Sequence, residues 1–123
     1  MLVLVCLSGT HAAAQAPGSC PTQIYFEFQV DAPASFRGDS SLHVVPVESR
    51  ELSPPNLVQF TVDTTGLADS LSFKVLRASD RELIAGARAA LRHWRFSPAR
   101  VGSCAVRQLY QTPIAPGRRR SAI

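Results

Sequence analysis

Charged residues are scarce in this sequence. They make up 18% of the 123 residues, whereas hydrophobic residues make up 46%. The formal net charge is +4, and Arg118, Arg119 and Arg120 supply three of the thirteen basic side chains. Without these three, ten basic residues stand against nine acidic ones, so the rest of the chain is almost neutral. Because nucleic-acid binding needs concentrated positive charge, we expect no nucleic-acid partner and interpret the basic end as a solvated tail.

The usual signatures of catalysis and of metal or phosphate binding are also missing. The sequence has no Gly-rich phosphate loop, and its carboxylates are scattered rather than paired for acid–base chemistry. His43 and His93 have no cysteine or carboxylate at metal-ligand spacing. A nucleophilic pair of His93 and Cys104 is conceivable, although a disulfide would compete for the same sulfur. We therefore predict no enzyme activity, no cofactor and no metal, and a small thiol enzyme or hydrolase is the least favoured alternative.

The sequence lacks a long hydrophobic run. Its first residues, Met1 to Leu7, are apolar apart from Cys6, and Ala12-Ala13-Ala14-Gln15 offers a small-x-small cleavage site. The run is far shorter than the roughly 20 residues of a membrane-spanning helix. We interpret residues 1–14 as a secretory signal peptide, with a disordered apolar N-terminus as the alternative. The expected location is periplasmic or secreted, with no membrane span.

Cleavage of the signal peptide would leave two cysteines, Cys20 and Cys104. In an exported protein a lone pair of cysteines is naturally interpreted as a disulfide. It would tie the start of the mature chain to the last strand. The alternative is two unrelated buried thiols.

Composition and periodicity divide the mature chain into three parts. Residues 15–22 contain Pro17, Gly18 and Pro21 and form a linker, residues 23–114 form the domain, and residues 115–123 form a flexible basic tail. Within the domain, alternation over residues 23–31 predicts a half-buried strand. Its predicted buried face carries Ile24, Phe26, Phe28 and Val30. A short strand ending at Pro46 and one or two helical turns at residues 48–52 are expected next.

A hairpin, a helix and a strand are predicted between Leu57 and Ile114. Two alternating runs, residues 57–63 and 71–77, flank a turn in which Gly66 can take a positive φ. Leu71, Phe73 and Val75 are assigned to one face of the second run. The final run, residues 104–112, follows a tight turn at Gly102 and is rich in strand-forming residues.

The helix between these strands has the sharpest local signal. Ser79 followed by Glu82 fits a capping box, and the apolar residues from Leu83 to Trp94 fall on one stripe. The helix should run over about residues 80–94. A helix on a small antiparallel sheet, made of the hairpin and the last strand, is a two-layer α+β fold.

Several short motifs resemble the C-terminal domain of the TonB energy-transducer family. Val58 to Gly66 is similar to V-x-F-x-V-D-x-x-G, and Ala87 to Ala99 is similar to A-x-x-A-L-x-x-W-x-F-x-P-A. Phe73 to Ser79 falls where the family has its second strand and the Ser before the helix. The resemblance covers about residues 57–114 and implies a TonB C-terminal-like fold in the periplasm.

The resemblance also implies a partner. The family binds the N-terminal box of TonB-dependent outer-membrane transporters, in transport across the outer membrane. Strand addition along the last strand would then involve five residues, which are Val106, Gln108, Leu109, Tyr110 and Gln111. A second hypothesis is a stand-alone periplasmic structural or adaptor module that forms a homodimer through the same sheet edge, without energy transduction.

Overall fold

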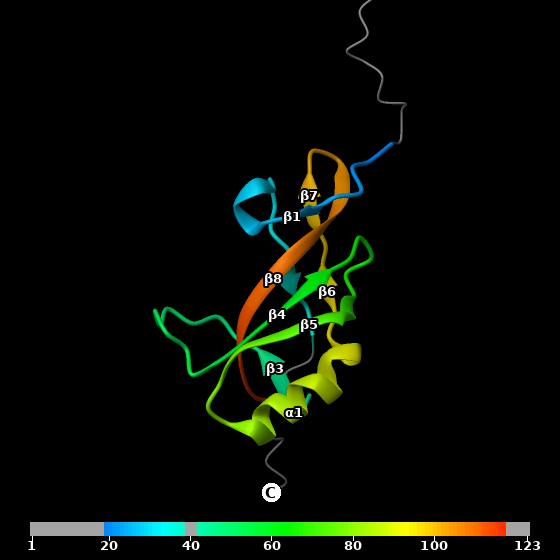
Figure 1. Ribbon diagram of the computed structural model, residues 1–123. Helices are drawn as coiled ribbons and strands as arrows, with labels where there is room; N and C mark the ends of the chain where they lie inside the picture. Colours follow the sequence, from blue (N-terminus) through cyan, green and yellow to red (C-terminus); the bar gives the residue numbers. More distant parts are fainter. Residues whose placement is uncertain (1–18, 39–41, 118–123) are drawn as a thin grey trace, which may run out of the picture.

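The computed structural model describes residues 19–38 and 42–117 (Figure 1). The predicted signal peptide at residues 1–14 lies outside the described residues, as do Arg118, Arg119 and Arg120. The fold is α+β, as predicted, with a curled sheet and one α-helix. In chain order the elements are β1 (Ile24–Tyr25), η1 (Glu27–Gln29), β2 (Ser35–Phe36), β3 (Val44–Pro46), β4 (Asn56–Val62), β5 (Ala68–Ala78), α1 (Arg81–Ala90), η2 (Leu91–His93), β6 (Phe96–Ser97), β7 (Ala99–Val101) and β8 (Cys104–Pro116).

Strand β8 is the centre of the sheet. On one edge it pairs antiparallel with β4, from Gln108 opposite Val62 to Pro113 opposite Leu57, and β4 pairs in turn with β5. On its other edge β8 pairs with β1 and then with β3, and its first residues form a hairpin with β7. The β1 pairing is parallel, whereas the others are antiparallel. Strands β2 and β6 form a separate two-stranded sheet.

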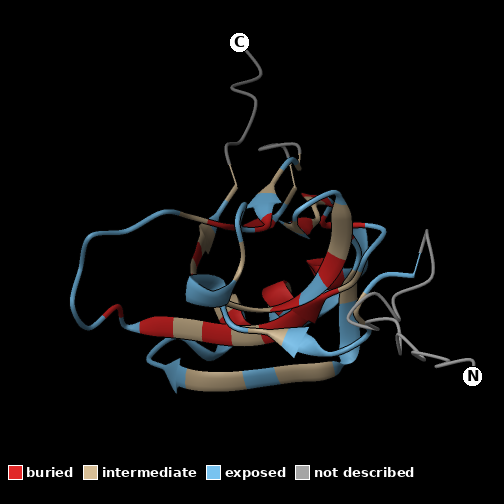
Figure 2. Cartoon of the chain, turned by 90° about the horizontal axis from the view of Figure 1, so that it is seen from above, coloured by how far each residue is buried: buried red, intermediate tan, exposed pale blue. Residues whose placement is uncertain are grey.

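The core lies between this curled sheet and α1, and Figure 2 shows the buried segments gathered there. Phe60, Val58 and Val62 of β4 are completely buried, as is Trp94 at the end of the helical region. The Trp94 indole N–H donates to the carbonyl oxygen of Val44 at 3.0 Å, which fixes β3 beside the helix. The alternation read from residues 57–63 is therefore confirmed for Phe60 and Val62.

The helix starts differently from the prediction. Asp80, not Ser79, is the N-cap, and its carboxylate accepts hydrogen bonds from the N–H groups of Glu82 (3.0 Å) and Leu83 (3.1 Å). Ser79 is bound instead to the sheet, because its N–H donates to the side-chain oxygen of Asn56 (3.0 Å). The predicted capping box is wrong for this reason. The α-helix ends at Ala90 and η2 continues to His93, close to the predicted end.

The strand predicted over residues 23–31 is mostly wrong. Only Ile24–Tyr25 forms a strand, and the chain then enters η1, where the Gln29 side-chain oxygen accepts the Phe26 N–H at 2.9 Å. Phe26 and Phe28 are exposed and stack on each other, with ring centroids 5.6 Å apart. This local hydrogen bond replaces further ladder pairing, so the alternating aromatic residues do not face the core.

A bulge overturns the predicted burial of Leu71, which is 97% exposed. The Leu71 N–H donates to the Asp69 carboxylate at 3.0 Å, and the Ser72 hydroxyl donates to the Asp69 carbonyl oxygen while it accepts the Thr61 N–H. These bonds hold β5 out of register with β4 at this point. Phe73 and Val75, which follow the bulge, pack against the core as expected.

The two other departures concern where regular structure begins and ends. Residues 48–52 form no helix, and Leu52 is fully exposed there, so the segment has no apolar contact to hold a helical turn.

Strand β8 passes through Pro113 and ends at Pro116. Proline is tolerated because the Pro113 position points its backbone groups away from β4, so no β4 ladder bond is lost. Ala115 and Pro116, assigned to the tail, therefore belong to β8.

Candidate functional site

The outer edge of β8 is interrupted in its middle. Strand β1 covers Arg107 and Gln108, and β3 covers Ile114–Pro116. Between them, Leu109–Pro113 has no register partner other than β4 among residues 19–38 and 42–117, although two groups at its ends are already bonded on the outer edge. The Pro113 carbonyl oxygen accepts the Val47 N–H, and the parallel pairing of Tyr25 with Gln108 directs the Tyr25 carbonyl oxygen to the Leu109 N–H. We call this five-residue stretch the β8 gap.

Backbone geometry shows which groups the β8 gap offers. In an antiparallel strand the N–H and C=O groups of one residue point to the same side, and the sides alternate along the chain. The Pro113 carbonyl oxygen faces away from β4, because it accepts the Val47 N–H at 3.0 Å. Leu109 and Gln111 therefore direct their backbone groups to the same side as Pro113. Because the pairing of β1 already uses the Leu109 N–H, the N–H and C=O of Gln111 are the open pair of backbone groups. The Leu109 oxygen has only a long contact there, 3.4 Å from Gln108 Nε2.

A groove with a volume of about 950 Å³ lies along the β8 gap. Residues of β8 form its floor, one wall comes from η1 and the chain around β2, and the other from the end of β3 and the loop after it. The lining residues are Glu27, Pro33, Ala34, Ser35, Phe36, Pro46, Val47, Glu48, Ser49, Arg50, Tyr110, Gln111, Thr112 and Pro113.

Buried side chains of β8 hold both walls of the groove. On one side, Gln108 is 1% exposed and its Oε1 accepts the Ala34 N–H at 2.8 Å. On the other, the buried Thr112 hydroxyl lies 3.3 Å from the Val47 carbonyl oxygen and 2.8 Å from that of Pro113. The walls are therefore fixed to the same strand that forms the floor.

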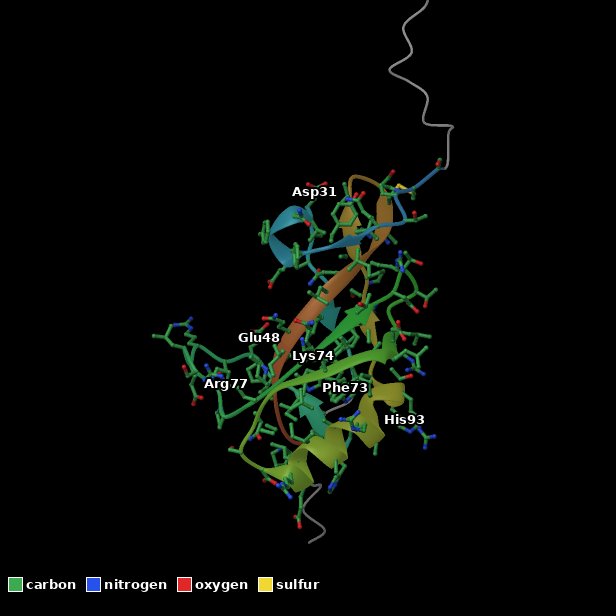
Figure 3. The ribbon with its side chains drawn as sticks, viewed as in Figure 1. Asp31, Glu48, Phe73, Lys74, Arg77 and His93 are labelled. Carbon is green, nitrogen blue, oxygen red and sulfur yellow. A yellow bond between two sulfur atoms is a disulfide. The ribbon has the colours of Figure 1, made fainter. Side chains whose placement is uncertain are left out.

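Tyr110 is the aromatic residue of the groove floor. Its half-buried ring packs against Phe96, with centroids 4.9 Å apart, and Phe60, at 5.5 Å. Burial, followed by the negative charges of Glu27 and Glu48, raises the pKa of the Tyr110 phenol. Glu48 is labelled in Figure 3 on the chain that follows β3. The two carboxylates thus act on one hydroxyl from opposite walls of the groove.

The five residues proposed for partner binding separate into two groups. Val106 is completely buried and its part of β8 pairs with Ala99 of β7, while Gln108 is buried and its part pairs with Tyr25 of β1. Leu109, Tyr110 and Gln111 lie in the β8 gap, and Gln111 is exposed. Its Nε2 donates to Gln59 Oε1 at 2.8 Å.

Sequence reasoning missed the groove walls. Glu27, Glu48 and the residues around Ala34 lie in short or irregular segments far from β8 in the chain, and they meet it only through tertiary pairing. The one available hint was the alternation that places Gln108 on the inward face of β8 with Val106, because a buried amide needs a hydrogen-bond partner.

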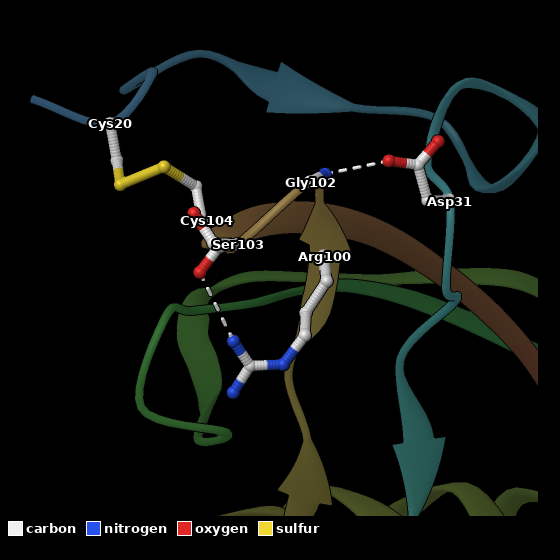
Figure 4. Close-up of a disulfide and its surroundings, with 6 residues drawn as sticks. All are labelled: Cys20, Asp31, Arg100, Gly102, Ser103 and Cys104. Carbon is white, nitrogen blue, oxygen red and sulfur yellow. Dashed lines mark hydrogen bonds between the residues drawn. A yellow bond between two sulfur atoms is a disulfide. The ribbon is translucent and has the colours of Figure 1, made fainter.

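Cys20 and Cys104 form the predicted disulfide, with their Cα atoms 5.6 Å apart (Figure 4). The bond fixes the start of the described chain to the beginning of β8, so the sulfur of Cys104 is not a free thiol. Nearby, the Asp31 carboxylate accepts the Gly102 N–H at 2.6 Å, and Gly102 has a φ of 58° in the β7–β8 turn. The segment carrying β1 and η1 is therefore attached to this turn at both its ends.

No cluster of three or more His, Cys, Asp or Glu residues that could hold a metal ion occurs in residues 19–38 and 42–117. No helix in the same ranges is long and apolar enough to cross a membrane.

Comparison with known proteins gave no match: no protein-family model and no curated protein matches this chain.

Proposed function

We propose that this domain binds an extended segment of a partner protein by strand addition at the β8 gap. The observation that carries the proposal is the coincidence of unpaired strand edge and groove: Gln111 turns its backbone N–H and C=O toward the side of β8 where a groove replaces a neighbouring strand. An added strand would supply the missing hydrogen bonds, and alternate side chains would fill the groove.

The dimensions of the site suit a short segment. Five residues of strand span about 17 Å at roughly 3.4 Å per residue. The groove volume of about 950 Å³ is at the upper end of the roughly 300–1,000 Å³ typical of ligand sites. Because β1 and β3 occupy β8 on either side, the segment is limited to the β8 gap unless one of these short strands is displaced.

We further propose that the domain is TonB C-terminal-like and works in the periplasm. The motif resemblance over residues 57–114 supports this, together with the matching order of hairpin, helix and long last strand. The Cys20–Cys104 disulfide suits an oxidising compartment. The partner would then be the N-terminal box of a TonB-dependent outer-membrane transporter.

The test is an amide NMR titration of the uniformly ¹⁵N-labelled mature chain with a transporter-box peptide. We expect chemical-shift changes at Leu109 and Gln111, and slowed hydrogen exchange at Gln111, because its N–H becomes hydrogen bonded. A matched peptide, N-methylated at the residues that face β8, should lose binding, whereas N-methylation at the alternate residues should leave it intact.

Two results would count against the proposal. Shifts confined to β5, which pairs on one edge with β4, would place binding elsewhere. A mass that doubles with concentration in the absence of peptide, with protection of the same Gln111 amide, would favour the homodimeric module instead.

A further inference from the structure

The side chains that line the groove carry an excess of negative charge. Three of its lining residues are charged: Glu27 on one wall, and Glu48 and Arg50 on the other. Two negative charges against one positive give the lining a net charge of −1, although the whole chain carries +4.

We propose that the groove selects an extended segment whose lysine or arginine side chain lies between Glu27 and Glu48, beside the Tyr110 hydroxyl. This inference rests on the proposed strand addition and names the chemistry of the segment. Both carboxylates come close enough to Tyr110 to disfavour a negative charge on its phenol. The same field that opposes an anion at this point favours a cation.

Strand geometry determines which residue of the partner would carry the positive charge. Side chains of adjacent strands that face the same side of a sheet are neighbours. Tyr110 and Thr112 lie on the inward face of β8 with Gln108, and Gln111 lies on the other face and is exposed. The cationic side chain must therefore occupy a position of the added strand that faces inward beside Tyr110, and the residues before and after it must face outward.

The phenol and the carboxylates would make complementary contacts with such a side chain. Tyr110 is held by Phe60 and Phe96, so its ring position is fixed before binding. The two glutamates are exposed at the rim of the groove. Rim charges give modest gains in affinity and larger gains in selectivity and salt dependence. A preference of about five- to tenfold for a basic over a neutral side chain is the expected size.

The probe is a set of three blocked pentapeptides, Thr-Val-X-Val-Thr, in which X is Lys, Met or Glu. Binding to the mature chain is measured by the NMR shifts of Leu109 and Gln111 at low and at physiological salt. We expect Lys to bind about five- to tenfold more tightly than Met, Glu to bind most weakly, and salt to reduce the difference between Lys and Met. In the double variant E27Q/E48Q the three peptides should bind within about twofold of one another.

The matched control is Glu82→Gln, which removes the same charge from the exposed first turn of α1, outside the groove. It should keep the Lys preference. Equal binding of all three peptides, with shifts at the β8 gap, would overturn the cation preference while strand addition stands. Failure of all three to bind would overturn both. If a variant ending at Gly117 binds the Lys peptide and the full chain does not, the chain's own Arg118–Arg120 segment occupies the groove, and the partner-segment inference is wrong.

Discussion

The side-chain oxygen of Gln108 accepts a hydrogen bond from the backbone N–H of Ala34 at 2.8 Å, across 74 residues of sequence. Both residues are buried. The bond joins the centre of β8 to the wall of the groove that contains Pro33, Ser35 and Phe36. Gln108, which was predicted to contact the partner, therefore supports one wall of the groove from its buried position.

The substitution Gln108→Leu should destabilise the fold by about 1–3 kcal/mol, because it leaves the buried Ala34 N–H without an acceptor while roughly preserving side-chain volume. Urea denaturation monitored by Trp94 fluorescence measures the loss. The matched control is Gln111→Leu on the same strand, whose exposed amide bonds only Gln59; it should change stability by less than about 0.5 kcal/mol. Equal effects of the two substitutions would contradict the structural role of Gln108.

Removal of the disulfide should weaken the whole fold. Cys20 and Cys104 close a loop with a sequence separation of 84, and the chain-entropy model assigns such a loop about 4–5 kcal/mol at most. The double variant C20S/C104S should therefore unfold at clearly lower denaturant than the oxidised protein. The reduced wild-type chain is the control and should match the variant, since both lack only the cross-link. Intact mass before and after reduction, two hydrogens apart, checks that the bond was present.

Local signals in the sequence identified the central elements of the fold. The hairpin, the helix and the last strand were all predicted, because Phe60, Val62 and the stripe ending at Trp94 repeat with the period of their element and face one shared core. The positive φ of Gly66 and the turn at Gly102 were also predicted, since glycine is favoured in both places.

The parts that failed depend on contacts that no local pattern contains. Phe26 and Phe28 alternate as a strand would, but the side chain of Gln29 turns the backbone into η1. Leu71 alternates correctly too, but Asp69 and Ser72, on either side of it, hold a bulge there. The β8 gap exists because two separate short strands, β1 and β3, stop on either side of it. That absence of pairing has no signature in residues 109–113.

Tyr110 should titrate above the usual range of a tyrosine. Its pKa is raised by burial and then by the charges of Glu27 and Glu48, so the folded state favours the neutral phenol. The resulting contribution to stability is present below the ordinary tyrosine value of about 10 and is lost as pH rises through the higher folded pKa. The variant Tyr25→Phe leaves Tyr110 as the one tyrosine, and the absorbance of its phenolate follows the titration.

Neutralising the two carboxylates provides the corresponding control. In the Tyr25→Phe background, E27Q and E48Q should each lower the pKa of Tyr110, and the pair together should lower it further, leaving the part due to burial. E82Q should leave it unchanged. If E27Q and E48Q had no effect, the carboxylates would not act on the groove floor, and the basis for a cationic partner side chain would be removed.

Asp63 and Gly66 of the V-x-F-x-V-D-x-x-G motif work together in the β4–β5 turn. Asp63 Oδ1 accepts hydrogen bonds from the Thr65 hydroxyl (2.6 Å) and from the N–H groups of Thr65 (2.8 Å) and Leu67 (3.0 Å). Gly66 has a φ of 86°, and a Cβ there would lie 2.0 Å from the Phe96 carbonyl oxygen. These two positions are thus explained by turn geometry, with no contact to the groove.

This turn should make the fold sensitive to acid. Burial by itself would raise the pKa of Asp63, but the hydrogen bonds from Thr65, Leu67 and Gly66 outweigh it and the pKa is lowered. Because the folded pKa lies below the unfolded one, the stabilisation is present above the ordinary Asp value of about 3.9 and is lost as pH falls through the folded pKa. Unfolding free energies of the wild type should therefore fall in this acid range more steeply than those of Asp63→Asn, which keeps an acceptor oxygen but cannot ionise.

The control is Asp69→Asn, because the Asp69 carboxylate accepts only the Leu71 N–H in the neighbouring bulge. Its pH dependence should stay close to that of the wild type, and an equal flattening in both variants would show that the effect is not specific to the turn.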